Sequence, residues 1–325
     1  MRSAVFESFG EPATVLEIKS SPTPNPGPGQ VRIKTILSAV HNHDLMTIAG
    51  QYGYKPPFPA IAGSEAVGTI DDLGEGVTGV TIGQRVSVAG AHGTWAEFFL
   101  ADARTIVPVP DTISDESAAQ LIGMPLSAIF LLRFVGAQPG QWIAQNAATG
   151  AVATALAMAA QAKGINVVNL VRQESAIADL ADLGIRNGVS TAGADWKQDV
   201  QKVAGGKPIV AGVDGVGGEA SGDLMSLLAE KGVLVSFGAM SGKPMQIPQG
   251  EIIFREGLIK GFWFTKLFQT APPEEINAAI GELLGLVSSD VIRLRVDSIF
   301  DLEKVAEAIS ANAAASRRGK VLLRL

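Results

Sequence analysis

Residues 142–172, WIAQNAATGAVATALAMAAQAKGINVVNLVR, constrain the fold of this chain more than any other stretch. A short apolar run, Trp142–Ala144, leads into a turn of small residues. An alanine-rich segment that ends near Gly164 then precedes a second apolar run, 165–171. The hydrophobic period therefore changes from that of a strand to that of a helix and back. This pattern predicts a βαβ unit, in which a crossover helix joins two parallel strands.

The turn at 146–152 has two open interpretations. Small residues let the backbone N–H groups at the start of a helix approach an anion such as a pyrophosphate. The G-x-G-x-x-G fingerprint is absent, but alanine can replace glycine where the need is close packing rather than positive φ. The alternative is a purely structural crossover. For a nucleotide, the candidate contacts in the turn are Asn146, Thr149, Gly150, Ala151 and Val152.

The end of the second strand favours one cofactor. An NAD site usually has Asp or Glu there, which accepts hydrogen bonds from the ribose, whereas an NADP site has Arg near the 2′-phosphate. Here Arg172 follows the strand directly, and the first acid is Glu174. A surface arginine after a strand is also common, but the pattern favours NADPH.

Composition excludes several classes of protein. A chain of 325 residues suits two domains, and a net charge of −6 lacks the basic footprint of a nucleic-acid-binding protein. There is no cysteine, which excludes disulfides, thiolate nucleophiles and cysteine-ligated zinc. Pro125 and Arg133 interrupt the longest apolar run, so no membrane span is expected. With no cleavable-signal pattern, these features predict a soluble cytoplasmic protein.

The order of elements predicts an α/β protein with two domains. Short strands with turn residues between them continue to about residue 118 and suggest a partly open barrel. Repeated βα units follow and indicate a doubly wound parallel sheet. A last strand, 320–325, is expected to rejoin the first domain. The predicted domains are 1–118, completed by 264–325, and 119–263.

Several stretches carry a family resemblance over nearly the whole chain. PTPNPGPGQVRIK, GEGVTGVTIGQRV and the turn at 146–152 occur in the order seen in the medium-chain dehydrogenase/reductase superfamily. The chain most resembles the zinc-free branch, which includes quinone oxidoreductases and mitochondrial-type 2-enoyl thioester reductases. The resemblance implies a β-rich GroES-like catalytic domain, a Rossmann domain that binds NADPH, and a homodimer formed edge to edge through the nucleotide-domain sheets.

Four stretches favour the enoyl reductases within this branch, although quinone reductases share part of the first. They are GQYGYKPPFPAIAGSEAVG (50–68), GTWAEFF (93–99), QNAATGAVA (145–153) and IFREGLIKGFW (253–263).

By the family pattern, His41 stands at the first cysteine ligand of zinc-dependent relatives, and Ser64-Glu65 replaces their His-Glu pair. No third ligand is seen near Gly123. The spacing of His41 and His43 is that of a strand, which would send their rings to opposite faces, so no catalytic metal is predicted. Reduction of a conjugated C=C bond or a quinone needs no Lewis acid.

Tyr52 is the main catalytic candidate. It lies in a loop flanked by glycine and proline, where a phenol can face a cleft. If hydride adds to the β-carbon of an enoyl thioester, a phenolic O–H near the thioester oxygen would stabilise the enolate. Without the resemblance, an aromatic side chain that only packs the loop is the simpler interpretation.

The resemblance implies roles for further residues. His41 and Asn42 lie where the family lines its nicotinamide pocket, although relatives commonly have Asn at position 41. His43 either relays a proton or hydrogen-bonds the backbone. Ser127 is expected near the nicotinamide, or as a locally satisfied helix hydroxyl. The other assigned residues are Gly238, Ala239, Met240 and Lys320 for the cofactor, and Trp263 for the wall of the substrate pocket.

The leading hypothesis is therefore an NADPH-dependent, zinc-free reductase that acts on a small-molecule enoyl thioester. An NADPH:quinone oxidoreductase is the alternative, and a non-catalytic NADPH-binding protein is the second alternative.

Overall fold

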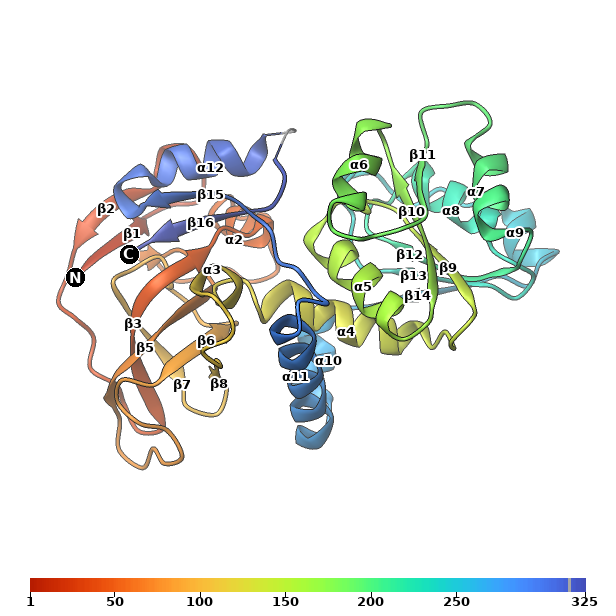
Figure 1. The fold of residues 1–325 in the computed structure, drawn as a ribbon. Coiled ribbons are helices and arrows are strands. Elements are labelled where there is room, and N and C mark those ends of the chain that lie inside the picture. Colours follow the sequence, from red (N-terminus) through yellow and green to blue (C-terminus); the bar gives the residue numbers. More distant parts are fainter. Residues whose placement is uncertain (315–316) are drawn as a thin grey trace. The chain divides into compact units, whose positions relative to one another are not determined.

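The computed structural model describes residues 1–314 and 317–325. They form two compact units, Met1–Gly123 with Leu294–Leu325, and Met124–Arg293. The first unit is rich in strands and the second alternates strands with helices (Figure 1).

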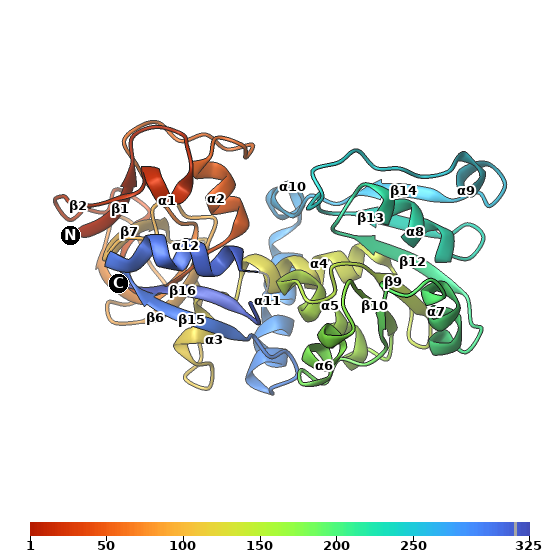
Figure 2. The same cartoon turned by 90° about the horizontal axis from the view of Figure 1, so that it is seen from above.

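The second unit is built on a six-stranded parallel sheet in the order β11-β10-β9-β12-β13-β14. Figures 1 and 2 show these strands side by side with helices around them. This order is that of a doubly wound dinucleotide fold, in which the strand order reverses between β9 and β12. The predicted doubly wound sheet is therefore confirmed. The strands are β9 (Trp142–Gln145), β10 (Asn166–Val171), β11 (Gly188–Ser190), β12 (Ile209–Asp214), β13 (Val233–Ser236) and β14 (Leu258–Gly261).

The βαβ unit forms where the sequence predicts it. All four residues of β9 are buried, as expected for a strand covered on both faces. The helix α5 (Ala151–Ala162) buries a run of alanines, whose small side chains let it lie close to β10. Gly164 adopts a φ of 70°, which glycine takes without steric cost, and the chain then enters β10.

The other helices of the second unit complete its layers. They are α4 (Gly123–Val135, whose first residue belongs to the first unit), α6 (Ser175–Ala181), α7 (Trp196–Ala204), α8 (Glu219–Leu227), α9 (Gln249–Ile253), α10 (Phe264–Thr270) and α11 (Pro273–Ser288). Right-handed crossovers place α5 and α6 on one face of the sheet and α8 on the other.

Two helices belong to a different unit from the one that the sequence indicated. The predicted boundary at residue 264 assigns α10 and α11 to the first domain, whereas the compact units return to the first domain only at Leu294. Glu282 on α11 pairs with Arg133 at 2.7 Å and with Lys163 at 2.8 Å. The ring of Phe264 lies 5.8 Å from that of Phe130. These contacts attach both helices to the second unit.

The first unit contains a seven-stranded mixed sheet and a three-stranded sheet. The long strand β3 pairs with β5 along one edge, and its other edge is shared by β7 and β16. The predicted return of the last strand is therefore confirmed. The strands are β1 (Arg2–Phe6), β2 (Glu17–Ser20), β3 (Gln30–Ala39), β4 (Ala60–Ile61), β5 (Glu65–Leu73), β6 (Arg85–Ala89), β7 (Phe98–Asp102), β8 (Val107–Pro108), β15 (Val296–Asp301) and β16 (Lys320–Arg324).

Short helices connect these strands. They are α1 (Pro12–Val15), α2 (Asn42–Ile48), α3 (Asp115–Ala118), the 3₁₀ turn η1 (Leu302–Lys304) and α12 (Val305–Ala313). The helix α2 corrects the prediction that His41 and His43 have strand-like spacing. The carboxylate of Asp44, in the first turn of α2, accepts a hydrogen bond from the backbone N–H of His41 at 3.0 Å. This bond starts a helix directly after β3.

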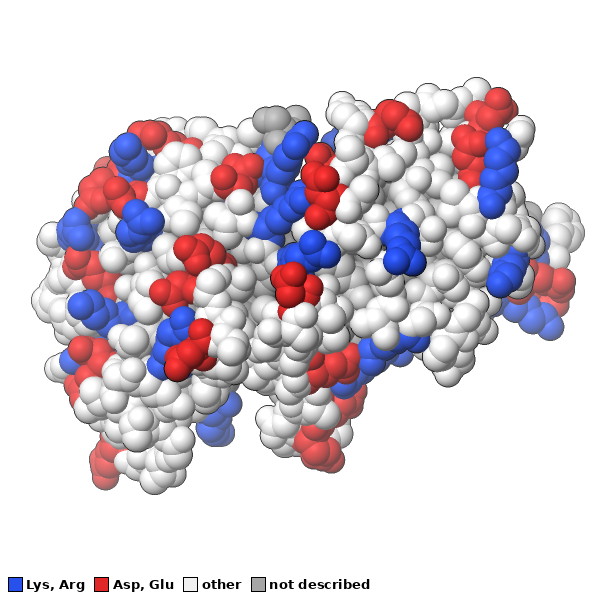
Figure 3. Space-filling view, in the orientation of Figure 1, with Lys and Arg blue, Asp and Glu red and all other residues white. Residues whose placement is uncertain are grey.

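On the face seen in Figure 3, acidic and basic side chains are interspersed and form no continuous basic patch. Among the described residues, no helix has both the length and the apolar character needed to cross a membrane.

Candidate active site

A buried chain of hydrogen-bonded side chains lies at the centre of the first unit. His41 Nε2 is 2.6 Å from Glu65 Oε2, and the ammonium of Lys320 is 3.2 Å from His41 Nδ1. His41 and Glu65 are each 1% exposed, and Lys320 is 8% exposed. The chain joins the start of α2 to β5 on one side and to β16 on the other.

The second oxygen of Glu65 anchors the segment that leads into α4. Glu65 Oε1 accepts hydrogen bonds from the backbone N–H groups of Ile122 at 2.7 Å and Gly123 at 2.8 Å. A Cβ atom at position 123 would lie 2.5 Å from Glu65 Oε2. Glycine is therefore required there for the carboxylate to stay in place.

Burial dominates the ionisation of this chain. It raises the pKa of Glu65 to about 7, against the lowering effect of the two backbone donors. Burial, followed by the charge of Arg317, lowers the pKa of Lys320 to about 8. Burial and the positive charge of Lys320 hold the pKa of His41 well below its usual range, so this imidazole is neutral.

His43 lies directly beside His41. The two rings are stacked, with centroids 4.8 Å apart and planes inclined by 12°. The prediction that they point to opposite faces is wrong, because the residues lie at the start of a helix and not in a strand. His43 Nε2 is 2.8 Å from Ser64 Oγ, so the side-chain hydroxyl, rather than a backbone group, is its partner.

The tyrosines lie beside the histidines. The ring of Tyr52 lies 5.7 Å from that of His43, and Tyr54 stacks on His92 with 4.2 Å between centroids. The protein has only three histidines and two tyrosines. Each of the two ring contacts joins a tyrosine to a histidine. Tyr54, His92 and the central position of Glu65 were not predicted, because their partners are distant in sequence.

In the second unit, most of the predicted cofactor and substrate residues follow the carboxyl ends of parallel strands. The turn at 146–150 follows β9, Arg172 follows β10, Gly238–Met240 follow β13, and Trp263 follows β14. Parallel strands end at one edge of a sheet, and ligands bind outside that edge where the strand order reverses. The structure therefore gathers these residues at the edge that such folds use.

Side chains, in place of glycines, hold the turn after β9. Ala147 adopts a φ of 49°, a conformation that costs an alanine roughly 1 kcal/mol. The side-chain amide of Asn146 donates to Asp214 at 2.7 Å and accepts from the N–H of Gly215 at 2.8 Å. The buried carboxylate of Asp214 also accepts from Ser221 Oγ at 2.5 Å. These bonds tie the first βα turn to the turn after β12.

Other predicted residues differ in their surroundings. Met240 is 71% exposed and Trp263 is 65% exposed, whereas Ser127 is buried on α4. Asn42 accepts a hydrogen bond from Asn312 on α12 at 3.1 Å. Lys320 was predicted as a cofactor contact, but its ammonium faces His41.

Comparison with known proteins agrees with this architecture. Residues 27–111 match the alcohol dehydrogenase GroES-like domain, and residues 151–284 match the zinc-binding dehydrogenase family. The mitochondrial enoyl-(acyl-carrier-protein) reductase of Caenorhabditis elegans is 30% identical over 300 residues, which cover 90% of this chain and 86% of that protein. The chain belongs to the medium-chain dehydrogenase/reductase superfamily.

Solved structures of this superfamily have the same fold. A mycobacterial quinone oxidoreductase is 28% identical, has a TM-score of 0.88, and each chain is covered completely. A mycobacterial protein solved in complex with NADPH is 27% identical, with the same TM-score and coverage. The predicted resemblance is confirmed, and the protein is an oxidoreductase of the branch that holds the quinone oxidoreductases and enoyl thioester reductases.

The raised pKa of Glu65 predicts a pH-dependent stability. The native carboxyl binds its proton more tightly than the unfolded one, so its contribution is present at low pH and is lost as pH rises from about 4.5 to about 7. The difference between wild type and Glu65→Gln in free energy of unfolding should change by roughly 3 kcal/mol over this range. Chemical denaturation at a series of pH values measures it.

Glu307→Gln, on the exposed side of α12, is the matched control and should follow wild type across the series. A Glu65→Gln curve parallel to that of wild type would show that Glu65 does not titrate in this range.

Proposed function

We propose that this oxidoreductase reduces the conjugated C=C bond of a 2-enoyl thioester with NADPH and without a metal ion. The observation that carries the proposal is the contact of Tyr52 with the His43–Ser64 pair, which brings three proton-bearing side chains together. The full-length likeness to an enoyl thioester reductase supports the substrate class.

The residues at the carboxyl edge of the second unit fit a dinucleotide phosphate. The helix α5 starts at the end of β9 with Gly150 as its N-cap, and no side chain caps its first N–H groups. These groups would bind the pyrophosphate, together with Thr149. Arg172, directly after the strand next to β9, would pair with the 2′-phosphate. When bound, NADPH supplies the hydride.

The donor set around His41 does not fit a zinc ion. Glu65 uses one oxygen for two backbone N–H groups and the other for His41. The ammonium of Lys320 faces the remaining nitrogen of His41 and would repel a cation. Among the described residues, no three or more histidine or acidic side chains are grouped as metal ligands. The family description as zinc-binding therefore does not apply to this arrangement.

Side chains of the first unit would stabilise the negative charge that grows on the substrate and would supply it with a proton. The Tyr52 hydroxyl would donate a hydrogen bond to the thioester oxygen, where negative charge grows as the β-carbon is reduced. His43 and Ser64 would pass a proton toward the α-carbon, directly or through Tyr52. His43 is partly exposed, so its proton can be renewed from water.

A quinone is the alternative acceptor. The mycobacterial structure named as a quinone oxidoreductase covers the whole chain at 28% identity, which favours this alternative. The same cofactor edge and the same phenol would serve it, since a quinone also gains negative charge on oxygen.

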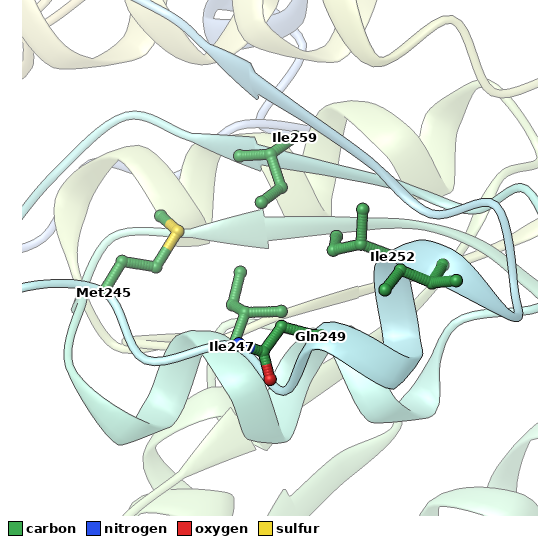
Figure 4. Close-up of a pocket in the computed structure, with 6 residues that line it drawn as sticks. Met245, Ile247, Gln249, Ile252 and Ile259 are labelled. Carbon is green, nitrogen blue, oxygen red and sulfur yellow. The ribbon is translucent and has the colours of Figure 1, made fainter.

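We further propose a homodimer in which β14 strands of two copies pair. All four residues of β14 are exposed, and the strand ends the sheet among the described residues. The apolar side chains of Ile253, Phe254 and Leu258 are more than half exposed beside it. A hollow of about 310 Å³ next to this edge is lined by Met245, Ile247, Gln249, Ile252, Ile253 and Ile259. Figure 4 shows side chains that line it. An exposed edge strand with apolar side chains beside it favours pairing with an identical strand, although β14 also carries the exposed Lys260.

The cytoplasm is the proposed compartment, because a chain without cysteine needs no oxidising environment. Several curated relatives carry the name mitochondrial. Fractionation of the source cells distinguishes the two locations.

Replacing Tyr52 should separate chemistry from cofactor binding. With crotonyl-CoA as acceptor, Tyr52→Phe should lower kcat by roughly 100-fold, because it removes one hydrogen bond to the developing oxyanion. The Kd for NADPH should stay unchanged. Tyr54→Phe is the matched control, since its ring stacks on His92 rather than beside His43. Unchanged turnover in Tyr52→Phe, or turnover with a quinone alone, would overturn the enoyl mechanism.

Arg172→Ala should raise the KM for NADPH by roughly 10-fold to 100-fold and leave the KM for NADH nearly unchanged. A charge-assisted pair with the 2′-phosphate is worth about 1.5–3 kcal/mol. Steady-state kinetics with both cofactors measure the ratio, and Arg186→Ala serves as a control before β11. Equal changes for the two cofactors would show that Arg172 does not bind the phosphate.

Ile259→Lys should convert the dimer to a monomer, because it puts a charge in the paired edge. Light scattering should give twice the chain mass of 33.7 kDa for wild type and the single mass for the variant. Ile82→Lys, at an apolar position that is 64% exposed in the first unit, should remain dimeric. A monomeric wild type would contradict the proposed assembly.

A further inference from the structure

Two neighbouring residues each bind one of the stacked imidazoles. Glu65 binds His41 at 2.6 Å, and Ser64 binds His43 at 2.8 Å. The two rings are nearly parallel, with 4.8 Å between centroids. The orientation of the partly exposed His43 therefore depends on the fully buried His41 below it.

The donors and acceptors around His41 permit one arrangement of protons. The protonated ammonium of Lys320 can only donate, so His41 Nδ1 must accept. A neutral imidazole carries one N–H, which is then on Nε2 and donates to Glu65 Oε2. All these bonds are made only while Glu65 is ionised, because its other oxygen already accepts two backbone N–H groups.

We propose that Lys320, His41 and Glu65 are positioning residues, which form a buried chain of fixed hydrogen-bond direction that holds His43 beside Tyr52 and Ser64 for proton transfer. The inference rests on the proposed function for the role of His43. The hydrogen-bonded chain itself does not depend on that function, because the distances between Lys320, His41 and Glu65 define it.

The hydrogen-bonded chain of Lys320, His41 and Glu65 should lose a bond on acidification. The titratable and charged groups that face His41 are Lys320 at the start of β16, Arg317 before it, Glu65 on β5, and His43 and Asp44 on α2. Arg317 and Lys320 favour the neutral imidazole, and Asp44 opposes them. Below about pH 7 the Glu65 carboxyl gains a proton, and one bond of the set is lost. Glu65→Gln puts a donor in the same place at every pH.

Nitrogen NMR of the imidazoles tests the chain without turnover. The protein has three histidines, so ¹⁵N-histidine labelling gives three ring systems. We expect one ring that is neutral, with its proton on Nε2, near pH 7.5, and that changes below about pH 7 as Glu65 gains a proton and above about pH 8 as Lys320 loses one. The same ring should change in Lys320→Gln. A His41 ring protonated on Nδ1, or charged, near pH 7.5 would overturn the proposal.

Kinetics of adjacent variants test the positioning role. Glu65→Gln should lower kcat by roughly 10-fold to 100-fold at a pH between the pKa values of Glu65 and Lys320, with an unchanged KM for NADPH, because a small displacement of a catalytic group has effects of this size. It should also remove the fall in kcat that wild type shows below pH 7. Ser64→Ala should change the signals of His43 but not the proton position of His41. A Glu65→Gln variant with wild-type kcat and an unchanged pH profile would overturn the proposal.

The double variant Glu65→Gln/Lys320→Gln should reverse the direction of both hydrogen bonds of His41. The amide introduced at position 65 can donate to Nε2 of His41, and the amide introduced at position 320 can accept from Nδ1–H. The loss of kcat in the double variant should be smaller than the product of the two single losses. Multiplicative losses would show that the three residues do not act as one chain. If wild type reduces neither acceptor but the NMR result is as expected, the proposed function is wrong, whereas the proposed hydrogen bonds of Lys320, His41 and Glu65 are supported.

Discussion

The carboxylate of Glu65 is the group on which the arrangement of the first unit depends. It is fully buried at the start of β5 and holds the ring of His41 with one oxygen and the backbone of Ile122 and Gly123 with the other. An ionised carboxylate inside a protein costs several kcal/mol unless it is well bonded. Three donors and the nearby charge of Lys320 offset part of this cost, and burial still raises the pKa of Glu65 to about 7. Gly123 leaves the space that the carboxylate needs.

In the second unit, the buried acid Asp214 has a comparable role at the carboxyl edge of the sheet. The usual glycines are missing from the turn after β9, and Ala147 takes a left-handed conformation instead. Asp214 and Asn146 bond the two turns that flank the reversal of strand order. The strain at Ala147 is therefore held by side-chain bonds, and no side chain caps the start of α5.

Periodicity predicted most of the fold. The βαβ unit at 142–172 and the last strand, which rejoins the first unit, form where the sequence indicates, because local pattern and tertiary burial agree there. The region after β3 was misread, since the residue that starts α2 is Asp44, whose bond to the backbone is not visible in hydrophobic spacing. The boundary at 264 was misread because ion pairs of Glu282, far from it in sequence, attach α11 to the second unit.

The site was predictable only in part. Tyr52, His43 and the turn at 146–152 were proposed from residue type and resemblance, and the rings of Tyr52 and His43 are neighbours in the structure. The chain through His41 was not found, because its members are 24 and 279 residues apart and the relevant signal is mutual distance. His92 and Tyr54 were missed for the same reason, since their ring contact joins two loops.

Isotope transfer tests the central claim most directly. NADPH that carries deuterium at C4 is incubated with the protein and crotonyl-CoA in ordinary water, and the product is analysed by mass spectrometry and NMR. The account predicts a saturated thioester with deuterium on the β-carbon and a solvent proton on the α-carbon. An unchanged enoyl thioester, with oxidation of the cofactor only when a quinone is added, would contradict it.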